Sequence, residues 1–189
     1  MKKPAVFLDR DGTIIEDAGF LRSQAQVDFY PQTFPALRRL ADFVLFIVTN
    51  QSGIAKGHIR IEEADAVNDY VVQRLAEAGT MIRAVYCCPH QRTDACKCMK
   101  PNSYFLRIAE REYDIDLTRS FVVGDHPSDV ELANGVGATG IYVLTGHGEK
   151  HRAEVPASTN VVADIGAAAD LILAAHNVGN PPAGLISAH

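Results

Sequence analysis

The feature that most constrains the fold of this chain is a regular alternation of short apolar runs with longer amphipathic segments. The apolar runs are expected to be strands, at Ala5–Leu8, Val44–Thr49, Ile82–Tyr86, Phe121–Val123, Gly140–Leu144 and, more weakly, Val161–Ala163. The amphipathic segments are expected to be helices, at Phe34–Phe43, Ile61–Ala78, Ser103–Tyr113, Ser128–Val136 and Ile165–His176. This order predicts an α/β, Rossmann-like three-layer sandwich, with a central, mainly parallel sheet covered by helices on both faces.

Length and composition narrow the class of protein. A chain of 189 residues suits one domain, which we expect over residues 1–176, with residues 177–189, rich in Gly, Pro and Ala, as a C-terminal tail. The net charge of −5 argues against a nucleic-acid partner held by a diffuse basic face. The apolar run near the start is too short for a secretory or membrane-spanning segment. We therefore expect a cytoplasmic monomer with no membrane partner.

Two acids follow the first apolar run. Asp9 and Asp11 stand at the end of an expected buried strand, and Gly12 allows a sharp exit of the chain. Both carboxylates can then turn into one pocket. This pattern suits a carboxylate nucleophile beside a carboxylic acid that handles protons, with a hard cation between them. A solvated acidic turn is the ordinary alternative, but three further motifs of the same chemistry weigh against it.

The three further motifs stand at or near other expected strand ends. Thr49 ends the second strand, and its hydroxyl and the amides that follow it can bind an anion. Lys100 precedes a helix and can meet a phosphate oxygen as a point charge. Asp125 ends the fourth strand, and Asp129 follows near a helix start, where a simple helix-capping role is the alternative. Each motif alone has an ordinary structural explanation.

Electrostatics connects these motifs. Two like charges about 4 Å apart repel by roughly 4 kcal/mol at an effective dielectric near 20. Asp9, Asp11 and Asp125 therefore need compensation before they can share a site or admit a phosphate. A divalent hard cation with carboxylate and water ligands supplies it, and substrate phosphate favours Mg²⁺. Lys100 would add a second positive charge.

In this order, the four motifs resemble those of the haloacid dehalogenase (HAD) superfamily of phosphatases, over about residues 4–145. The resemblance implies that Asp9 attacks phosphorus in line and forms an aspartyl-phosphate. It implies that Asp11 protonates the leaving alkoxide and then deprotonates the attacking water. Thr49 and Lys100 would hold the phosphoryl oxygens. Mg²⁺ would be held by Asp9, the backbone carbonyl of Asp11, and Asp125.

All four cysteines of the chain lie close together, beside one histidine. One histidine and three thiolates can close a tetrahedral structural Zn²⁺ site, and we expect Cys88, His90, Cys96 and Cys98 to form it. Adjacent Cys87 and Cys88 point to opposite sides of an extended chain, so one of them binds. Cys88 is preferred because it completes two short ligand pairs, although Cys87 stays open. Free thiols or a disulfide are the alternatives, and a cytosolic disulfide is disfavoured.

This zinc loop, at residues 87–100, resembles that of the D-glycero-D-manno-heptose-1,7-bisphosphate phosphatases and the similar histidinol-phosphate phosphatases. The resemblance implies these substrate contacts: Asp17, Ala18, Gly19, Phe20, Asn50, Gln51, Ser52, Met99 and His126. Two positions depart from the family pattern, since Met99 replaces a usual arginine and His126 a common lysine. Both remove positive charge from where a second phosphate could dock. His147 is expected to be a surface group.

The segments after the first two strands are too short for a separate lid domain, so we expect an open, capless site. The resemblance implies Mg²⁺-dependent hydrolysis of the C7 phosphate of D-glycero-D-manno-heptose 1,7-bisphosphate, a precursor of lipopolysaccharide core. Histidinol phosphate or another small phosphorylated metabolite, such as a sugar phosphate, is the alternative substrate. A zinc-stabilised binding module without catalysis is the alternative class. The preferred anomer is left open.

Overall fold

A six-stranded parallel sheet forms the centre of the protein, which a computed structural model describes over residues 2–179. The strands are β1 (Ala5–Leu8), β2 (Val44–Asn50), β3 (Ile82–Cys88), β4 (Phe121–Gly124), β5 (Thr139–Val143) and β6 (Asn160–Val162). Their order across the sheet is β3-β2-β1-β4-β5-β6, and each neighbouring pair is parallel. The six expected strands are confirmed, with small differences at their ends.

The main helices are α1 (Thr33–Arg39), α2 (Ile61–Glu77), α3 (Tyr104–Glu112), α4 (Pro127–Asn134) and α6 (Ile165–Gly179), and α5 (Gly148–His151) is a short one that the sequence did not indicate. The expected end of α1 at Phe43 is wrong. The amide of Leu40 bonds the carbonyl of Leu37, which tightens and ends the last turn. α6 extends three residues into the expected tail, and residues 180–189 of that tail lie outside the described residues.

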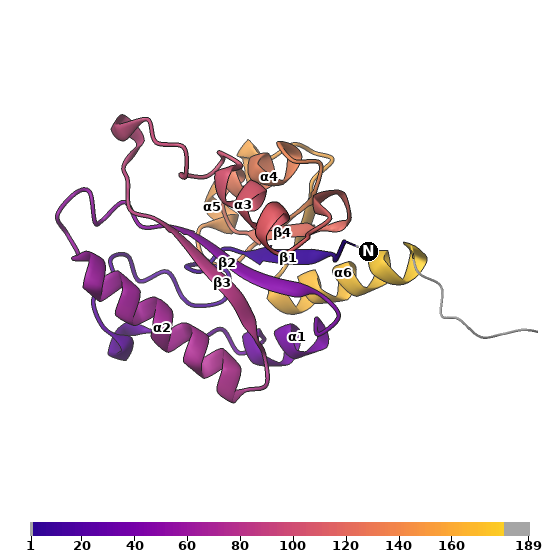
Figure 1. The fold of residues 1–189 in the computed structure, drawn as a ribbon, viewed down its shortest axis with the longest axis horizontal. Helices are drawn as coiled ribbons and strands as arrows, with labels where there is room; N and C mark the ends of the chain where they lie inside the picture. Colours follow the sequence, from indigo (N-terminus) through magenta and orange to yellow (C-terminus); the bar gives the residue numbers. More distant parts are fainter. Residues whose placement is uncertain (1, 180–189) are drawn as a thin grey trace, which may run out of the picture.

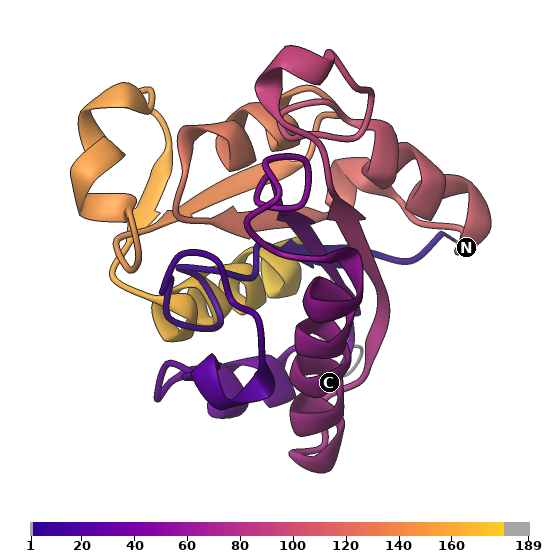
Figure 2. The same ribbon diagram turned by 90° about the vertical axis from the view of Figure 1, so that its left-hand side faces the viewer.

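Helices cover both faces of the sheet (Figures 1 and 2), and each face has its own apolar layer. Because side chains alternate along a strand, Val6 and Leu8 of β1 face one side, whereas Ala5 and Phe7 face the other. The first side packs against α1, α2 and α6, and the second against α3 and α4. The expected three-layer α/β sandwich is confirmed.

The strand order places the functional motifs at one edge of the sheet. β1 lies between β2 and β4, so the chain segments that leave these three strands diverge from neighbouring points. In such sheets, ligands bind beyond the carboxyl ends of the strands, where the strand order changes direction. Asp9, Thr49 and Asp125 stand at or just beyond these ends.

Within residues 2–179, no lid domain covers this edge. The segment between β1 and α1 contains only a short 3₁₀ helix, Gln24–Gln26, and α2 between β2 and β3 packs against the sheet itself. The site therefore opens between loops, as expected from the segment lengths. In the same part of the chain, no helix combines the length and the apolar character needed to cross a membrane.

Phe46 lies in the apolar layer between the sheet and helices α3 and α4. It is fully buried, and its ring lies 5.1 Å from that of Phe7, 5.4 Å from that of Tyr113 and 5.9 Å from that of Tyr86. We predict that Phe46→Ala lowers the free energy of unfolding by about 3–5 kcal/mol, because it leaves a cavity among these rings. Urea unfolding followed by circular dichroism measures this loss.

Met81→Ala is the matched control, since Met81 is 80% exposed, and we expect it to change the free energy of unfolding by less than about 0.5 kcal/mol. Equal losses in the two variants would contradict this account of the core.

Candidate active site

The end of β1 brings Asp9 against Asp125 from β4. The amide of Asp9 donates to the carbonyl of Val123 at 2.9 Å, so the chain is still held in the sheet at this residue. Gly12 then turns with φ +77°, and a Cβ at this position would overlap the Asp125 carboxylate. Glycine is thus required here both for the backbone conformation and for the close approach of the acid.

Lys100 is buried between two carboxylates. Its Nζ lies 2.8 Å from Oδ1 of Asp9 and 2.8 Å from Oδ1 of Asp129, and its side chain is 4% exposed. Its backbone amide donates to Oδ1 of Asn50 at 3.1 Å, which ties it to the end of β2. Burial alone would lower the pKa of Lys100, but Asp129 and Asp9 raise it well above its ordinary value. The two carboxylates therefore favour the charged form of the Lys100 side chain.

Three acids converge beside this lysine. Carboxylate oxygens of Asp9, Asp125 and Asp129 lie within 4.8 Å of one another. Burial raises the pKa of Asp9 well above its ordinary value, and Asp129 and Asp125 raise it further, although Lys100 opposes them. Burial likewise raises the pKa of Asp125 to about 6. Against one ammonium group, three ionised carboxylates leave two negative charges. The site thus fits a divalent, oxygen-liganded ion such as Mg²⁺.

Asp129 was expected as a helix-capping acid or a member of the site, and its carboxylate makes the contacts of both roles. Its Oδ2 accepts from the backbone amide of His126 at 3.2 Å at the start of α4, while its Oδ1 meets Lys100. It joins Asp9 and Asp125 in the acidic cluster, whereas the side chain of Asp11 does not.

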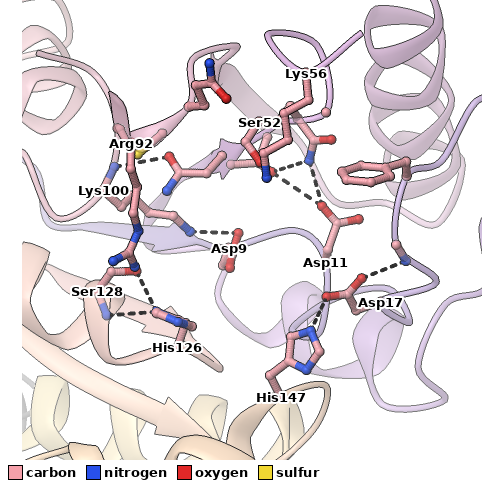
Figure 3. Close-up of a pocket in the computed structure, with 18 of the residues that line it drawn as sticks. Asp9, Asp11, Asp17, Ser52, Lys56, Arg92, Lys100, His126, Ser128 and His147 are labelled. Carbon is pink, nitrogen blue, oxygen red and sulfur yellow. Dashed lines mark hydrogen bonds and ion pairs between the residues drawn. The ribbon is translucent and has the colours of Figure 1, made fainter. Parts of the chain in front are cut away.

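Asp11 is held apart from these acids by its own partners. The buried Arg10 side chain donates from Nε and Nη2 to both Asp11 oxygens, at 2.9–3.2 Å. Gln51 donates from Nε2 to Asp11 Oδ2 at 2.8 Å and to the hydroxyl of Thr49 at 2.8 Å. Figure 3 shows Asp11 separate from Asp9 in the same pocket. This arrangement can supply a carboxyl group for proton transfer beside a carboxylate nucleophile.

Arg10 is a residue that the sequence reasoning missed. Its Nη1 donates to Oδ1 of Asn68 at 2.5 Å, and Asn68 is 5% exposed within α2. Asn68 lies beside Val67 among the buried residues of α2, and a polar residue there needs a polar partner. That asparagine was the available signal for a buried arginine.

One cavity of about 610 Å³ is lined by Asp9, Asp11, Thr49, Lys100 and Asp125 (Figure 3). Of the expected substrate contacts, eight line it: Asp17, Gly19, Phe20, Asn50, Gln51, Ser52, Met99 and His126. Ala18 is not among its lining residues. Seven lining residues had not been assigned to the site: Gly53, Lys56, Gln91, Arg92, Thr93, Ser128 and His147.

The segment at residues 17–21 is tied to both sides of the cavity. Asp17 Oδ2 lies 3.0 Å from Nε2 of His147, whose backbone amide donates to Asp125 Oδ2 at 2.7 Å. Phe20 packs on His58, with ring centroids 4.7 Å apart, and lies over Gly53, where any side chain would overlap the ring. His147 is half exposed, as expected for a surface group, yet it links this segment to the acidic cluster.

His126 is fixed at the start of α4. Its Nδ1 lies 3.0 Å from the hydroxyl of Ser128 and accepts from the Ser128 amide at 3.3 Å. Burial lowers the pKa of His126 below its ordinary value. A neutral imidazole at this wall can contact a substrate but provides little positive charge.

The sulfur and nitrogen atoms of the loop after β3 form a second cluster. Cys98 Sγ lies 3.1 Å from Cys88 Sγ, 3.7 Å from Cys96 Sγ and 3.2 Å from His90 Nδ1, and Cys88 Sγ lies 3.6 Å from Cys96 Sγ. The ligands of a tetrahedral zinc ion are separated by about 3.5–3.8 Å, given Zn–S bonds near 2.3 Å. The four residues therefore fit Zn²⁺.

Cys87 lies outside that group. It pairs in register with Thr49, whereas Cys88 pairs with Asn50, so the two cysteines alternate along β3. Burial raises the pKa of the Cys87 thiol, which is close to Asn68 and Arg10 rather than to the other sulfur atoms.

Comparisons with known proteins agree on one family. The family model described as HAD-hydrolase-like matches residues 97–168. The D-glycero-beta-D-manno-heptose-1,7-bisphosphate 7-phosphatase of Bordetella bronchiseptica is 35% identical over 173 residues, which cover 89% of this chain and 97% of the relative. The alpha-anomer enzyme of Campylobacter jejuni is 35% identical over 133 residues, which cover 69% of this chain and 76% of the relative.

Solved structures give the same result. The crystal structure of the Bordetella bronchiseptica D,D-heptose 1,7-bisphosphate phosphatase, complexed with magnesium and phosphate, has a TM-score of 0.84 and 34% identity, and the match covers 90% of this chain and 98% of that one. The enzyme from Burkholderia thailandensis has a TM-score of 0.69 and 29% identity, and the match covers 90% and 99% of the two chains. The chain therefore belongs to the D-glycero-D-manno-heptose-1,7-bisphosphate 7-phosphatase family of HAD-like hydrolases.

Proposed function

We propose that this protein hydrolyses the C7 phosphate of D-glycero-D-manno-heptose 1,7-bisphosphate, with Asp9 as the nucleophile. The observation that carries the proposal is the buried Lys100, in contact with Asp9 and Asp129 on the wall of an open cavity. A lysine in this position can bind a phosphoryl oxygen while Asp9 attacks phosphorus. The family and the named relatives supply the substrate.

The reaction has two steps at Asp9. In the first, an Asp9 oxygen bonds to phosphorus as the bond to the sugar oxygen breaks, and Asp11 gives a proton to that leaving oxygen. In the second, Asp11 takes a proton from water, which attacks phosphorus and releases phosphate and free Asp9. Arg10 and Gln51 hold Asp11 in place for both transfers. The hydroxyl of Thr49 and the Lys100 ammonium group bind the phosphoryl oxygens.

Asp9 and Asp125, with the backbone carbonyl of Asp11, are the proposed holders of Mg²⁺, and Asp129 lies close enough to assist them. When bound, this ion supplies positive charge that permits a phosphate dianion to approach buried carboxylates. The magnesium in the Bordetella bronchiseptica crystal structure supports the choice of ion.

We propose a structural role for Zn²⁺ at Cys88, His90, Cys96 and Cys98. Cys98 precedes Lys100 by two residues, so the zinc cluster determines where the lysine enters the site. We further propose that residues 1–176 act as one catalytic unit, as a cytoplasmic monomer. Both anomers occur among the named substrates of the relatives, so the anomer that this protein prefers needs a direct comparison.

Replacement of Asp9 tests the nucleophile. We predict that Asp9→Asn lowers kcat for phosphate release by at least about 10⁴-fold, because the amide cannot form the covalent intermediate. The measurement is phosphate release from heptose 1,7-bisphosphate in the presence of Mg²⁺. Asp42→Asn, an exposed site away from the cavity, is the matched control and should keep the activity of the unaltered protein. Undiminished hydrolysis by Asp9→Asn would remove the assignment.

The zinc assignment has a control in the neighbouring cysteine. We predict about one Zn²⁺ per chain by native mass spectrometry, with loss of zinc and of most activity in Cys88→Ser, because three ligands hold the ion poorly. Cys87→Ser should keep both, since its sulfur lies outside the cluster.

Chelation provides a second readout for zinc. Removal of the ion, followed by resupply of Mg²⁺, should lower activity because the loop that carries Lys100 loses its anchor. Retained zinc in Cys88→Ser, or full activity and unchanged folding after verified zinc removal, would contradict the structural role.

A further inference from the structure

Two cations on the cavity wall have no role in the reaction as derived above. Lys56, Arg92 and Lys100 all line the cavity, and Lys100 is engaged by Asp9 and Asp129. Neither Lys56 nor Arg92 forms an ion pair with any of residues 2–179. A bisphosphate brings a second anionic group into the same cavity, and an unpaired cation is available to bind it.

The position of Arg92 relative to Met99 and His126 is informative. Neither of these two side chains carries a permanent positive charge. Arg92 lines the same cavity as both, and the three residues also line a second, adjoining cavity of about 500 Å³. In Figure 3, the Arg92 side chain extends toward Ser128 and His126. Arg92 thus brings a permanent positive charge to the wall formed in part by Met99 and His126.

Arg92 lies on a short loop with a residue of the zinc cluster on each side. Arg92 begins a 3₁₀ helix, Arg92–Asp94, between the zinc-cluster residues His90 and Cys96. Within this turn, the amide of Gln91 donates to Asp94 Oδ2 at 3.0 Å, and the amide of Asp94 donates to the carbonyl of Gln91 at 3.0 Å. These hydrogen bonds fix the backbone position of Arg92, and its side chain is exposed.

We propose that Arg92 binds the phosphate at C1, the end of the substrate that does not react. This inference rests on the proposed function. The planar guanidinium group can donate two parallel hydrogen bonds to a phosphate, which an ammonium group cannot do. Lys56 belongs to a different element, the loop after β2, and adds general attraction for anions.

The test compares two substrates that differ only in the C1 phosphate: heptose 1,7-bisphosphate and heptose 7-phosphate. The protein, loaded with Mg²⁺ and Zn²⁺, is assayed for the ratio of kcat/KM between them. Arg92→Met should lower this ratio by about 10- to 100-fold, as expected for loss of hydrogen bonds to a charged group. Zinc content and the circular dichroism spectrum verify that the loop is intact.

Two control variants make the result specific. Lys97→Met changes a lysine of the same loop that lines neither cavity, and should leave the ratio unchanged. Lys56→Met should lower kcat/KM for both substrates without a large change in the ratio. A ratio lowered by Lys56→Met and kept by Arg92→Met would overturn the inference.

The outcomes also separate this inference from the proposed function. If the unaltered protein has a large ratio and Arg92→Met keeps it, the role of Arg92 is contradicted. The proposed function is not affected by that result. A ratio near one in the unaltered protein contradicts the bisphosphate as substrate, and the Arg92 inference with it. The Asp9→Asn assay then still reports whether the protein is a phosphatase.

Discussion

The contact of Lys100 with Asp9 and Asp129 is the interaction on which the site depends. A buried lysine loses the stabilisation that water gives its charge. The two carboxylates, each 2.8 Å from Nζ of Lys100, replace that stabilisation only if they keep these positions. The same contact leaves Asp125 and one further negative charge without compensation. A divalent cation would neutralise these two charges, and a phosphate would then be held by the cation and by Lys100.

The loop at residues 87–100 borders both the proposed catalytic residues and the proposed C1-phosphate contact. It carries Lys100 at one end and Arg92 between its ligands, and the amide of Lys100 is bonded to Asn50 at the end of β2. With no lid domain among residues 2–179, loops alone border the open cavity. The proposed zinc ion would thereby set the positions of both Lys100 and Arg92 without taking part in the chemistry.

Much of this was accessible from sequence because the pattern is local. Strand and helix positions follow from apolar periodicity, and the shared edge of Asp9, Thr49 and Asp125 follows from parallel topology. Arg92 as a lining residue was not accessible, since it depends on packing between elements distant in the chain, whereas the buried Arg10 had only the polar Asn68 within α2 as a signal. The end of α1 was misjudged because apolar residues continue past Arg39, while the backbone already turns at Leu40.

The most direct test of the central claim is a crystal structure of the protein grown with Mg²⁺ and beryllium trifluoride, a mimic of the phosphoryl group. The account predicts that the Asp9 carboxylate contacts both the mimic and the metal, with the Lys100 ammonium within hydrogen-bond distance of the mimic. An Asp9 side chain that points away from both would contradict it.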